Sequence, residues 1–538
     1  MVKKEILEKT KKKAKKGLFR TIFSRSFIFA LLLILQLFAY FFICSSILTS
    51  ESVKYLSLII IAVIFGFVII NKNDNPAIII TWLFLILGFP VFGIFIYFFT
   101  IVQPQVKTLK KEYIKEFDKT KDILDKDDEI LQKLKKENED IYNLSNYLNK
   151  YSGSIIDSNS DIKYFAWGEE KFEYLKKELK KAQNFIFMEY FIIDFGEMWD
   201  EILNILIDKA QKGVEIRLMY DGTNTFSRLP VKYPKELESL GIKCKVFSPI
   251  RPVFTTYQNH RDHRKIVVID GKVAFTGGIN LADEYIGKYE RFGKWKDTGV
   301  MISGNAVKNF TLMFLQIWNL KSKNKKEKKC LATAYTVEQY AMLYQKYTNI
   351  SYKTQSNGYV LGYGDSPFDT ERVGENVYLQ MINTAKRYVH IMTPYLILSY
   401  EMIQALTFAA KKGVDVKIIM PHIPDKKYAF WVARTYYQNL IDNGVKIYEW
   451  KPGFVHAKVF VVDDIQACVG SINIDFRSLC LHLECSSYIY NNSEILNIEK
   501  DYEKTLEECI EVNNDFIKKI PKIQIYLGQI LKLFAPLL

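Results

Sequence analysis

Hydrophobic residues are concentrated in three uncharged stretches near the beginning of the chain, at residues 27–48, 55–70 and 77–102. A helix that crosses a bilayer needs about 20 apolar residues, so the first and third stretches are long enough and the second is marginal. A strongly basic segment, residues 1–26, precedes them. We therefore expect a basic N-terminal segment followed by a transmembrane region of two or three helices over residues 27–104.

The distribution of basic residues gives an expectation for the orientation of these helices. Cytoplasmic ends of membrane helices are enriched in Lys and Arg, and both residues 1–26 and the segment after residue 104 are basic. Both ends cannot lie in the cytoplasm if all three stretches cross. Either one stretch is interfacial or re-entrant, with residues 55–70 the candidate, or the rule is violated at one end. We expect a multi-pass protein of the cell membrane, with the lobes that follow on the cytoplasmic side.

Beyond residue 104 the hydrophobic pattern changes twice. Residues 105–150 combine Lys, Glu and Asp with Ile and Leu at helical spacing, which predicts an amphipathic helical connector. From about residue 151, short β-forming runs alternate with helical segments that end at glycines. The expected strands are residues 185–188, 214–218 and 244–247, then 389–392, 414–419 and 445–448. Strands that alternate with helices imply parallel sheets covered on both faces.

The same order of elements occurs twice, which predicts two lobes. The first is expected over residues 151–330 and the second over residues 331–538, with a Lys-rich exposed linker at residues 321–329. The chain ends in an apolar tail, residues 520–538, that either packs on the second lobe or lies at the membrane interface. The predicted fold class is α/β, with two lobes behind an N-terminal helical membrane region.

One short pattern occurs once in each lobe. Each copy reads His, any residue, Lys, four residues, Asp: His263, Lys265 and Asp270 in the first lobe, and His456, Lys458 and Asp463 in the second. Each continues into a Gly-rich turn at the same distance after its histidine, beginning at Gly277 and at Gly470. Two copies with matching tails indicate a duplicated unit that brings two histidines together.

These residue types are suited to chemistry on a phosphate. The residues after each lysine are β-formers, and on a strand residues two apart point to the same face, so each His and Lys are expected to project together. Lysine supplies positive charge to phosphate oxygens. A neutral histidine can attack phosphorus while a second, protonated histidine hands a proton to the leaving oxygen. This chemistry requires no metal and no cofactor.

The two aspartates of the pattern are expected to play a different part. Asp270 precedes Gly271, which is a strong hairpin signal. Asp270 also lies at odd spacing from Lys265, so on a continuous strand it would face away from a shared pocket. We interpret Asp270 and Asp463 as turn or structural anchors rather than proton carriers.

Further polar residues are candidates for supporting roles. Asp297 could orient His263, and Glu484 could orient His456, each through the second ring nitrogen; an ordinary surface carboxylate is the alternative in both cases. The Gly-rich turns can bring small polar groups close to a phosphate, although such residues also serve simply to shape a turn. The candidates in these turns are Asn280, Ser471 and Asn473.

Charge and cysteine content narrow the class of protein. The formal net charge of +14 suits nucleic acid or an anionic membrane surface. The seven cysteines show no CxxC pair and no Cys/His spacing typical of zinc. We therefore expect reduced, mostly buried thiols in a cytosol-facing protein.

The doubled motif, with its Gly-Gly-Ile-Asn and Gly-Ser-Ile-Asn tails, resembles the phospholipase D superfamily. Other segments are similar to bacterial cardiolipin synthases: Asn75-Pro76 with Trp82, residues 89–93 with Tyr97, Tyr190, Asp283, Tyr285, residues 295–298, residues 393–395, residues 473–478 and the closing residues 535–538. The resemblance implies two pseudo-symmetric lobes with mixed sheets flanked by helices. It also implies transfer of a phosphatidyl group between two phosphatidylglycerol molecules, giving cardiolipin and glycerol.

In that family one histidine forms a phosphatidyl-enzyme intermediate and the other acts as acid, then base; we assign the nucleophile to His263. The sequence departs from the family at His482, where Asn is usual, and at Lys296, where Arg is more common. The stretch 27–48 is an addition. These changes affect the tuning of His456 and the topology, not the reaction class.

Two other functions remain open from the sequence. A lipid hydrolase would use the same intermediate with water as the acceptor. A phosphodiesterase or nuclease could use the same His/Lys pocket, and the net charge fits nucleic acid. The apolar N-terminal region places the pocket beside lipid, and no base-stacking module is evident. We therefore expect phosphatidylglycerol and anionic membrane lipid as partners, and not nucleic acid. The sequence does not indicate an oligomeric state.

Overall fold

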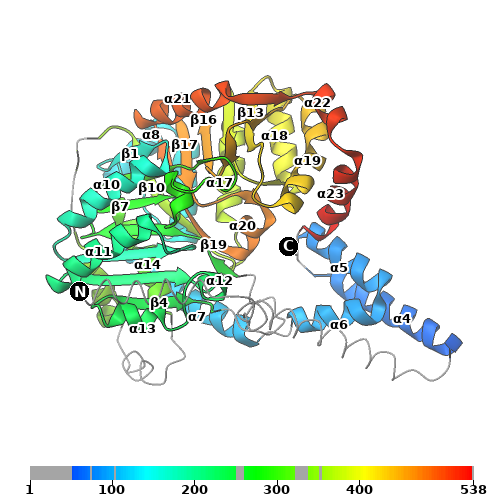
Figure 1. The fold of residues 1–538 in the computed structure, drawn as a ribbon, viewed down its shortest axis with the longest axis horizontal. Helices are drawn as coiled ribbons and strands as arrows, with labels where there is room; N and C mark the ends of the chain where they lie inside the picture. Colours follow the sequence, from blue (N-terminus) through cyan, green and yellow to red (C-terminus); the bar gives the residue numbers. More distant parts are fainter. Residues whose placement is uncertain are drawn as a thin grey trace.

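The structure is a computed structural model that describes residues 51–72, 75–101, 104–249, 260–320, 337–350, 354 and 356–535. The expected basic segment 1–26, the first apolar stretch 27–48 and the linker 321–329 lie outside the described residues. Figure 1 shows two lobes side by side and a group of helices, α4 to α6, that extends away from them at one end.

Each lobe is built on one β-sheet, and the two sheets follow the same strand order. The first sheet has the order β1-β9-β7-β6-β2-β3-β4, and the second has the order β10-β19-β17-β16-β11-β13-β14-β20. The first-lobe strands are β1 (Asp161–Phe165), β2 (Phe185–Tyr190), β3 (Glu215–Asp221), β4 (Lys243–Phe247), β5 (Arg261–Asp262), β6 (Lys265–Ile269), β7 (Val273–Gly277), β8 (Lys294–Lys296) and β9 (Gly299–Ser303). The second-lobe strands are β10 (Tyr359–Asp365), β11 (Tyr388–Met392), β12 (Leu396–Ile397), β13 (Asp415–Pro421), β14 (Lys446–Trp450), β15 (Gly453–Val455), β16 (Val459–Val462), β17 (Gln466–Gly470), β18 (Ile474–Asp475), β19 (His482–Tyr490) and β20 (Cys509–Val512).

Helices cover the outer face of each sheet, and others lie in the core between the sheets. The first-lobe helices are α10 (Gly168–Lys181), α11 (Glu197–Gln211), α12 (Asn224–Ser227), α13 (Tyr233–Glu238), the 3-10 helix η2 (Asp283–Ile286) and α14 (Val307–Trp318). The second-lobe helices are α17 (Val373–Thr384), α18 (Tyr400–Lys411), α19 (Lys427–Asp442), α20 (Phe476–Leu481), α21 (Glu494–Glu507) and α22 (Asn514–Lys519). Residues of both sheets, α14 and α21 form one hydrophobic core that joins the lobes.

The expected parallel arrangement is present in only part of each sheet. β2, β3 and β4 are parallel neighbours, as are β11, β13 and β14. The motif strands β6 and β16 instead pair antiparallel with β2 and β11. Each motif strand also forms an antiparallel hairpin with the strand that follows it, because the three-residue connection from β6 to β7 is too short for a crossover helix. The sheets are therefore mixed, as the family resemblance implies.

The motif strands are buried on both faces. In β6, Ile266 and Val268 point into the core that joins the lobes, whereas Val267 and Ile269 point into the core under α10 and α11. The residues of β16 alternate in the same way between two cores. A strand with no solvent-facing side has to be apolar throughout, which explains the unbroken apolar run after each motif lysine.

The aspartates Asp270 and Asp463 hold the beginning of the neighbouring strand. The Asp270 carboxylate accepts hydrogen bonds of 2.7–2.8 Å from the backbone N–H groups of residues 183–185, where β2 begins. Asp463 accepts equivalent bonds of 2.7–2.8 Å from residues 386–388, where β11 begins. Both lie in the turn at the far end of the motif strand from the histidine, so their geometry is that of structural anchors.

The helices of the connector contribute to both lobes. They are α7 (Pro104–Thr120), α8 (Asp128–Glu137) and α9 (Glu139–Ser152). α7 packs on α14, whereas α9 packs on α17. A further helix, α16 (Val337–Thr348), falls in the range expected for the second lobe but packs on the first sheet, where the Tyr347 hydroxyl donates to Glu215 at 2.7 Å. The expected boundary at residue 331 therefore lies before a helix that belongs spatially to the first lobe.

The expected membrane region is described from residue 51 onward. α4 (Glu51–Ile70) covers the second apolar stretch, and the third is divided at Pro90 into α5 (Pro76–Gly88) and α6 (Pro90–Ile101). Within the described residues, no helix combines the length and apolar character needed to cross a membrane. The three helices pack on one another around Trp82 and Ile86.

The apolar tail forms α23 (Lys522–Phe534), which packs along α19. Its end touches α5, where the Thr81 hydroxyl donates to the backbone carbonyl of Leu533 at 2.7 Å. Apolar side chains at helical spacing on α23 are exposed: Ile523, Tyr526, Leu527 and Ile530. The tail thus packs on the second lobe with one face and leaves an apolar stripe open on the other.

Candidate active site

Short strands exchanged between the lobes bring the two motifs together. β5, just before His263, pairs in parallel with the first residues of β19 in the second lobe. In return, β15, just before His456, pairs in parallel with β8 of the first lobe. The backbone N–H of His263 donates to the carbonyl of Leu483 at 2.9 Å, and that of His456 donates to the carbonyl of Lys296 at 2.7 Å. Each motif histidine is therefore fixed against the opposite lobe.

This exchange decides which carboxylate orients which histidine. His263 Nδ1 lies 2.9 and 3.0 Å from the two carboxylate oxygens of Glu484. His456 Nδ1 lies 2.6 Å from Asp297 Oδ2. The expected pairs, Glu484 with His456 and Asp297 with His263, are wrong. Leu483 and Lys296 accept hydrogen bonds from the backbone of the histidine in the opposite lobe, and Glu484 and Asp297 directly follow them in the chain. Each carboxylate therefore contacts the histidine of the opposite lobe.

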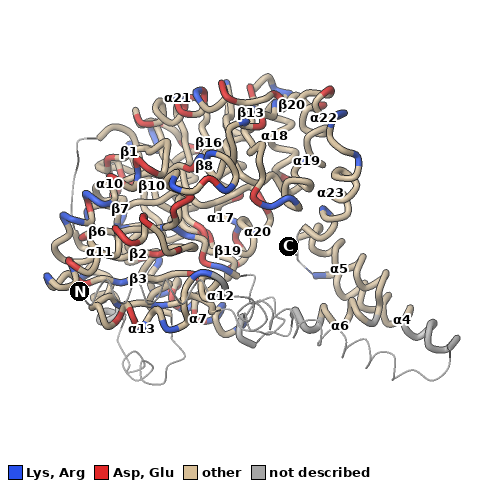
Figure 2. Tube along the Cα trace, in the orientation of Figure 1, with Lys and Arg blue, Asp and Glu red and all other residues tan. Residues whose placement is uncertain are grey.

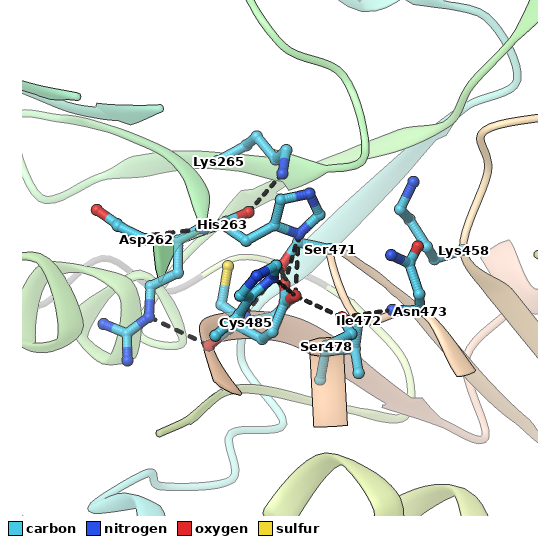
Figure 3. A network of polar contacts seen from close by, with 12 residues as sticks. Asp262, His263, Lys265, Lys458, Ser471, Ile472, Asn473, Ser478 and Cys485 are labelled. Carbon is cyan, nitrogen blue, oxygen red and sulfur yellow. Dashed lines mark hydrogen bonds and ion pairs between the residues drawn. The ribbon is translucent and has the colours of Figure 1, made fainter. Parts of the chain in front are cut away.

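The motif lysines lie next to their histidines and are fully buried. Lys265 Nζ donates a hydrogen bond to the backbone carbonyl of His263, and Lys458 Nζ donates to that of His456. Figure 3 shows Lys265 and Lys458 on either side of His263 and the residues around it. Burial lowers the pKa of Lys265 to about 8 and that of Lys458 to about 7, and nearby carboxylates oppose this effect.

The two carboxylates have different surroundings. Glu484 accepts hydrogen bonds from the hydroxyls of Ser471 and Ser478 in addition to its contact with His263. Burial raises the pKa of Glu484, but the contacts with His263 and His482 lower it by more. The net pKa of Glu484 therefore lies well below its usual range. Asp297 has one other hydrogen bond in the described residues, from the N–H of Thr298 at 2.8 Å. A Cβ on Gly278 would lie 2.2 Å from Asp297 Oδ1, so the first lobe has no room for the serine that the second lobe carries at Ser471.

Burial favours the neutral form of both histidine rings. Burial lowers the pKa of His263 well below its usual value, against an opposing effect of Glu484. Burial together with Lys458 lowers the pKa of His456 to about 4, against an opposing effect of Asp297. With Nδ1 held by a carboxylate, each ring keeps Nε2 for a substrate.

The asparagines of the Gly-rich turns differ in their partners. The side chain of Asn280 is bound within the first lobe. Its amide oxygen accepts a hydrogen bond from the N–H of Ile192 at 3.0 Å, and its amide nitrogen donates to the Tyr285 hydroxyl at 2.8 Å. Asn473 is buried, and its side-chain oxygen has no hydrogen-bond partner among the described residues. Both asparagines line the cavity between the two lobes.

Both histidines open into one cavity of about 510 Å³ between the lobes. An aromatic wall surrounds them, and Trp295 lies 5.4 Å and Tyr285 5.7 Å from His456 between ring centroids. The cavity lining contains more basic than acidic residues. The basic ones are Arg228, Arg261, Arg291, Lys426 and Arg477, and the acidic ones are Glu284, Asp425 and Asp475. A cavity of this charge suits an anionic substrate.

Sequence reasoning missed most of these basic residues. Arg228 follows β3, and Lys426 follows β13, so both lie beyond the carboxyl ends of parallel strands. That position is where ligands bind in open α/β sheets, and it is the signal that could have found them. Lys296, by contrast, does not line the cavity. Its Nζ donates to Asp501 at 2.7 Å in an ion pair that joins β8 to α21, so its role is structural.

The strand order, the paired His/Lys motifs and the shared cavity define a phospholipase D-like protein with two lobes. Comparison with known proteins refines this class. Residues 175–318 and 378–509 match the family described as cardiolipin synthase, PLD-like domain. The chain belongs to this cardiolipin synthase family and is an enzyme of the phosphatidyltransferase class.

Relatives match over nearly their whole length. A cardiolipin synthase of Alkalihalophilus pseudofirmus is 34% identical over 510 residues, which cover 93% of this chain and 97% of that protein. An uncharacterized protein of Streptococcus mutans serotype c is 50% identical over 470 residues, covering 87% of this chain and 98% of that protein. A phosphatidylserine synthase of Haemophilus influenzae has a similar fold, with a TM-score of 0.53 at 14% identity over 73% of this chain and 97% of its own.

The crossed pairing of histidines and carboxylates predicts a specific effect of Asp297→Asn. We expect kcat to fall by about 10²- to 10⁴-fold, because the asparagine no longer holds the correct tautomer of His456. The ¹⁵N NMR signals of the His456 ring should change, whereas those of His263 should not. Glu484→Gln is the matched control and should change the His263 signals instead. Movement of the His263 signals in Asp297→Asn would contradict the pairing.

Proposed function

We propose that the protein is a cardiolipin synthase that transfers a phosphatidyl group from one phosphatidylglycerol to another and releases glycerol. The observation that carries this proposal is the pair of histidines, each oriented by a buried carboxylate, in one cavity with surplus basic residues. One imidazole whose Nε2 attacks phosphorus and a second whose Nε2 carries a proton to and from the oxygen fit a displacement at phosphorus in two steps. Phosphatidylglycerol is chosen as the substrate because relatives named cardiolipin synthase match this chain over nearly their whole length.

In the first step, His263 Nε2 attacks the phosphorus of phosphatidylglycerol and forms a phosphatidyl-histidine. The bond from phosphorus to the glycerol headgroup oxygen breaks, and His456 gives that oxygen a proton. His456 takes up this proton from solvent when the anionic lipid binds, because a negative charge nearby raises the pKa of an imidazole, and the second step restores the proton. His263 fits the nucleophile because its pKa is held well below the usual value, which keeps it neutral.

In the second step, a hydroxyl of the second phosphatidylglycerol attacks the phosphatidyl-histidine. His456 takes the proton of this hydroxyl, the bond from phosphorus to His263 Nε2 breaks, and cardiolipin leaves. Lys265 and Lys458 stabilise the negative charge on the phosphate oxygens in both steps. No other group has to donate or accept electrons, so the reaction balances without a cofactor.

We further propose that the apolar helices lie against a lipid bilayer. Figure 2 shows charged residues scattered over both lobes, whereas α5 and α6 carry none. The exposed stripe of α23 is continuous with α5 through the contact between the rings of Phe84 and Phe534, whose centroids lie 6.0 Å apart. The cavity lining reaches Ala535, the residue that follows α23. A lipid could therefore pass from this surface to the histidines. We also propose that the N-terminal apolar region is inserted in the cell membrane and that the two lobes lie on the cytoplasmic side.

The reaction is tested with purified protein in vesicles of phosphatidylglycerol. We expect cardiolipin and free glycerol in equal amounts, measured by mass spectrometry and an enzymatic glycerol assay. His263→Ala and His456→Ala should each lower the rate by at least about 10³-fold, because each removes a reacting group. Phosphatidic acid as the main product would favour a lipid hydrolase. Activity on DNA or RNA with none on lipid would favour the phosphodiesterase.

The low pKa values of the lysines predict a pH dependence. A lysine carries its charge below its pKa and loses it above, so Lys458 and Lys265 lose charge as the pH rises through about 7 and about 8. We expect kcat/KM for phosphatidylglycerol to fall between about pH 6 and pH 9, since this parameter reports the free enzyme. Lys458→Arg should flatten the profile, because arginine stays charged. Equal kcat/KM values across this range in the wild-type chain would contradict the prediction.

The membrane surface is tested at Ile530, which is 60% exposed on α23. A polarity-sensitive fluorophore on Ile530→Cys should be quenched by nitroxide-labelled lipids after reconstitution, because the side chain lies among acyl chains. The same label on Leu496→Cys, 56% exposed on α21, is the matched control and should not be quenched. Labelled wild-type chain gives the background from the native cysteines. Equal quenching at both positions would exclude α23 as the lipid-facing helix.

A further inference from the structure

His482 differs from every other histidine in the chain. The Nδ1 atoms of the other five histidines each have a hydrogen-bond partner in the structure. His482 is only 8% exposed, and neither of its ring nitrogens has a hydrogen-bond partner among the described residues. Its ring lines the cavity, so two unused donor or acceptor atoms are buried at the candidate active site. Such groups are rare in folded proteins and call for a ligand.

Two further ligating groups lie next to His482. One ring nitrogen of His263, one of His482 and one carboxylate oxygen of Glu484 all lie within 4.8 Å of one another. His482 Nδ1 is 3.6 Å from Glu484 Oε1, and His263 Nδ1 is 2.9 Å from the same oxygen. Ligands at the usual zinc distances of about 2.0–2.2 Å in a tetrahedral site lie about 3.3 Å apart. Small side-chain movements would therefore suffice to place all three around one ion.

We propose that His263, His482 and Glu484 form a Zn²⁺ site and that the bound ion inhibits the enzyme. To bind the ion through Nδ1, the His263 ring moves its proton from Nδ1 to Nε2. No proton is released in this change of tautomer, but Nε2 then carries hydrogen and has no lone pair with which to attack phosphorus. Zinc binding and the first reaction step are thus mutually exclusive. This inference rests on the proposed function only for the inhibition, not for the binding.

The ligand set selects the kind of ion. Two imidazoles and one carboxylate suit zinc, whereas Mg²⁺ and Ca²⁺ prefer oxygen ligands throughout. Three protein ligands leave the fourth zinc position to water or to a phosphate oxygen. Lys265, whose Nζ bonds to the carbonyl of His263, places positive charge nearby and weakens the affinity. We therefore expect binding in the micromolar range, suited to a reversible inhibitor rather than a structural ion.

The experiment uses the purified full-length chain, with Zn²⁺ titrated by calorimetry and Co²⁺ as a spectroscopic substitute. We expect His482→Asn to weaken the binding by at least about 10-fold, because it removes one ligand. Glu503→Gln is the matched control. Glu503 belongs to a second group with ligand spacing, His390, Glu499 and Glu503, so this variant tests whether zinc binds there instead. Its affinity should equal that of the wild-type chain, and Mg²⁺ should not compete.

Inhibition is measured in phosphatidylglycerol vesicles, with each variant compared with its own metal-free rate. Zinc should inhibit the wild-type chain and Glu503→Gln at the same concentration, and His482→Asn should need at least about 10-fold more. Unchanged zinc affinity in His482→Asn overturns the proposed site, whether or not the protein makes cardiolipin. Tight binding that depends on His482 without inhibition overturns the inhibitory role alone. A chain that binds zinc through His482 but makes no cardiolipin contradicts the proposed function and leaves the metal site standing.

Discussion

The exchange of carboxylates between the two lobes is the interaction on which the candidate site depends. Each histidine is held at its backbone and at Nδ1 by the opposite lobe, through Leu483 and Glu484 or through Lys296 and Asp297. Neither lobe alone therefore contains an oriented imidazole. The burial of these carboxylates costs free energy that a hydrogen-bonded partner offsets, so the site is complete only where the two lobes are packed together.

Two chemically identical histidines require different protonation states to act as nucleophile and acid, and the fold provides an asymmetry of this kind. Glu484 shares its charge among His263, Ser471 and Ser478, whereas Asp297 lies 2.6 Å from His456 with fewer competing donors. A carboxylate with fewer competing donors stabilises an imidazolium more strongly. This difference favours His456 as the proton carrier in the proposed mechanism. The duplicated sequence thus supplies two equal residues that their surroundings make unequal.

The surface around the site suits a substrate that is itself part of a membrane. Basic residues line the cavity, and its lining reaches the end of α23, whose exposed stripe joins the uncharged α5. An anionic headgroup and its acyl chains could then be held by different parts of one continuous surface. The same cavity contains His482, which adds a third imidazole beside Glu484.

The sequence by itself determined the two lobes, the repeated order of elements, and the convergence of two His/Lys pairs. These features follow from local periodicity and from the repetition of a pattern, and the ends of the expected strands agree with β2, β4 and β11 to within two residues. It also indicated that Asp270 and Asp463 were anchors, because a hairpin turn has a local signature. Only the tertiary structure decided that the motif strands run antiparallel to their neighbours, that Glu484 serves His263 and Asp297 serves His456, and that Arg228 and Lys426 line the cavity. These facts depend on contacts between residues far apart in the chain, and periodicity along a sequence carries no information about such contacts.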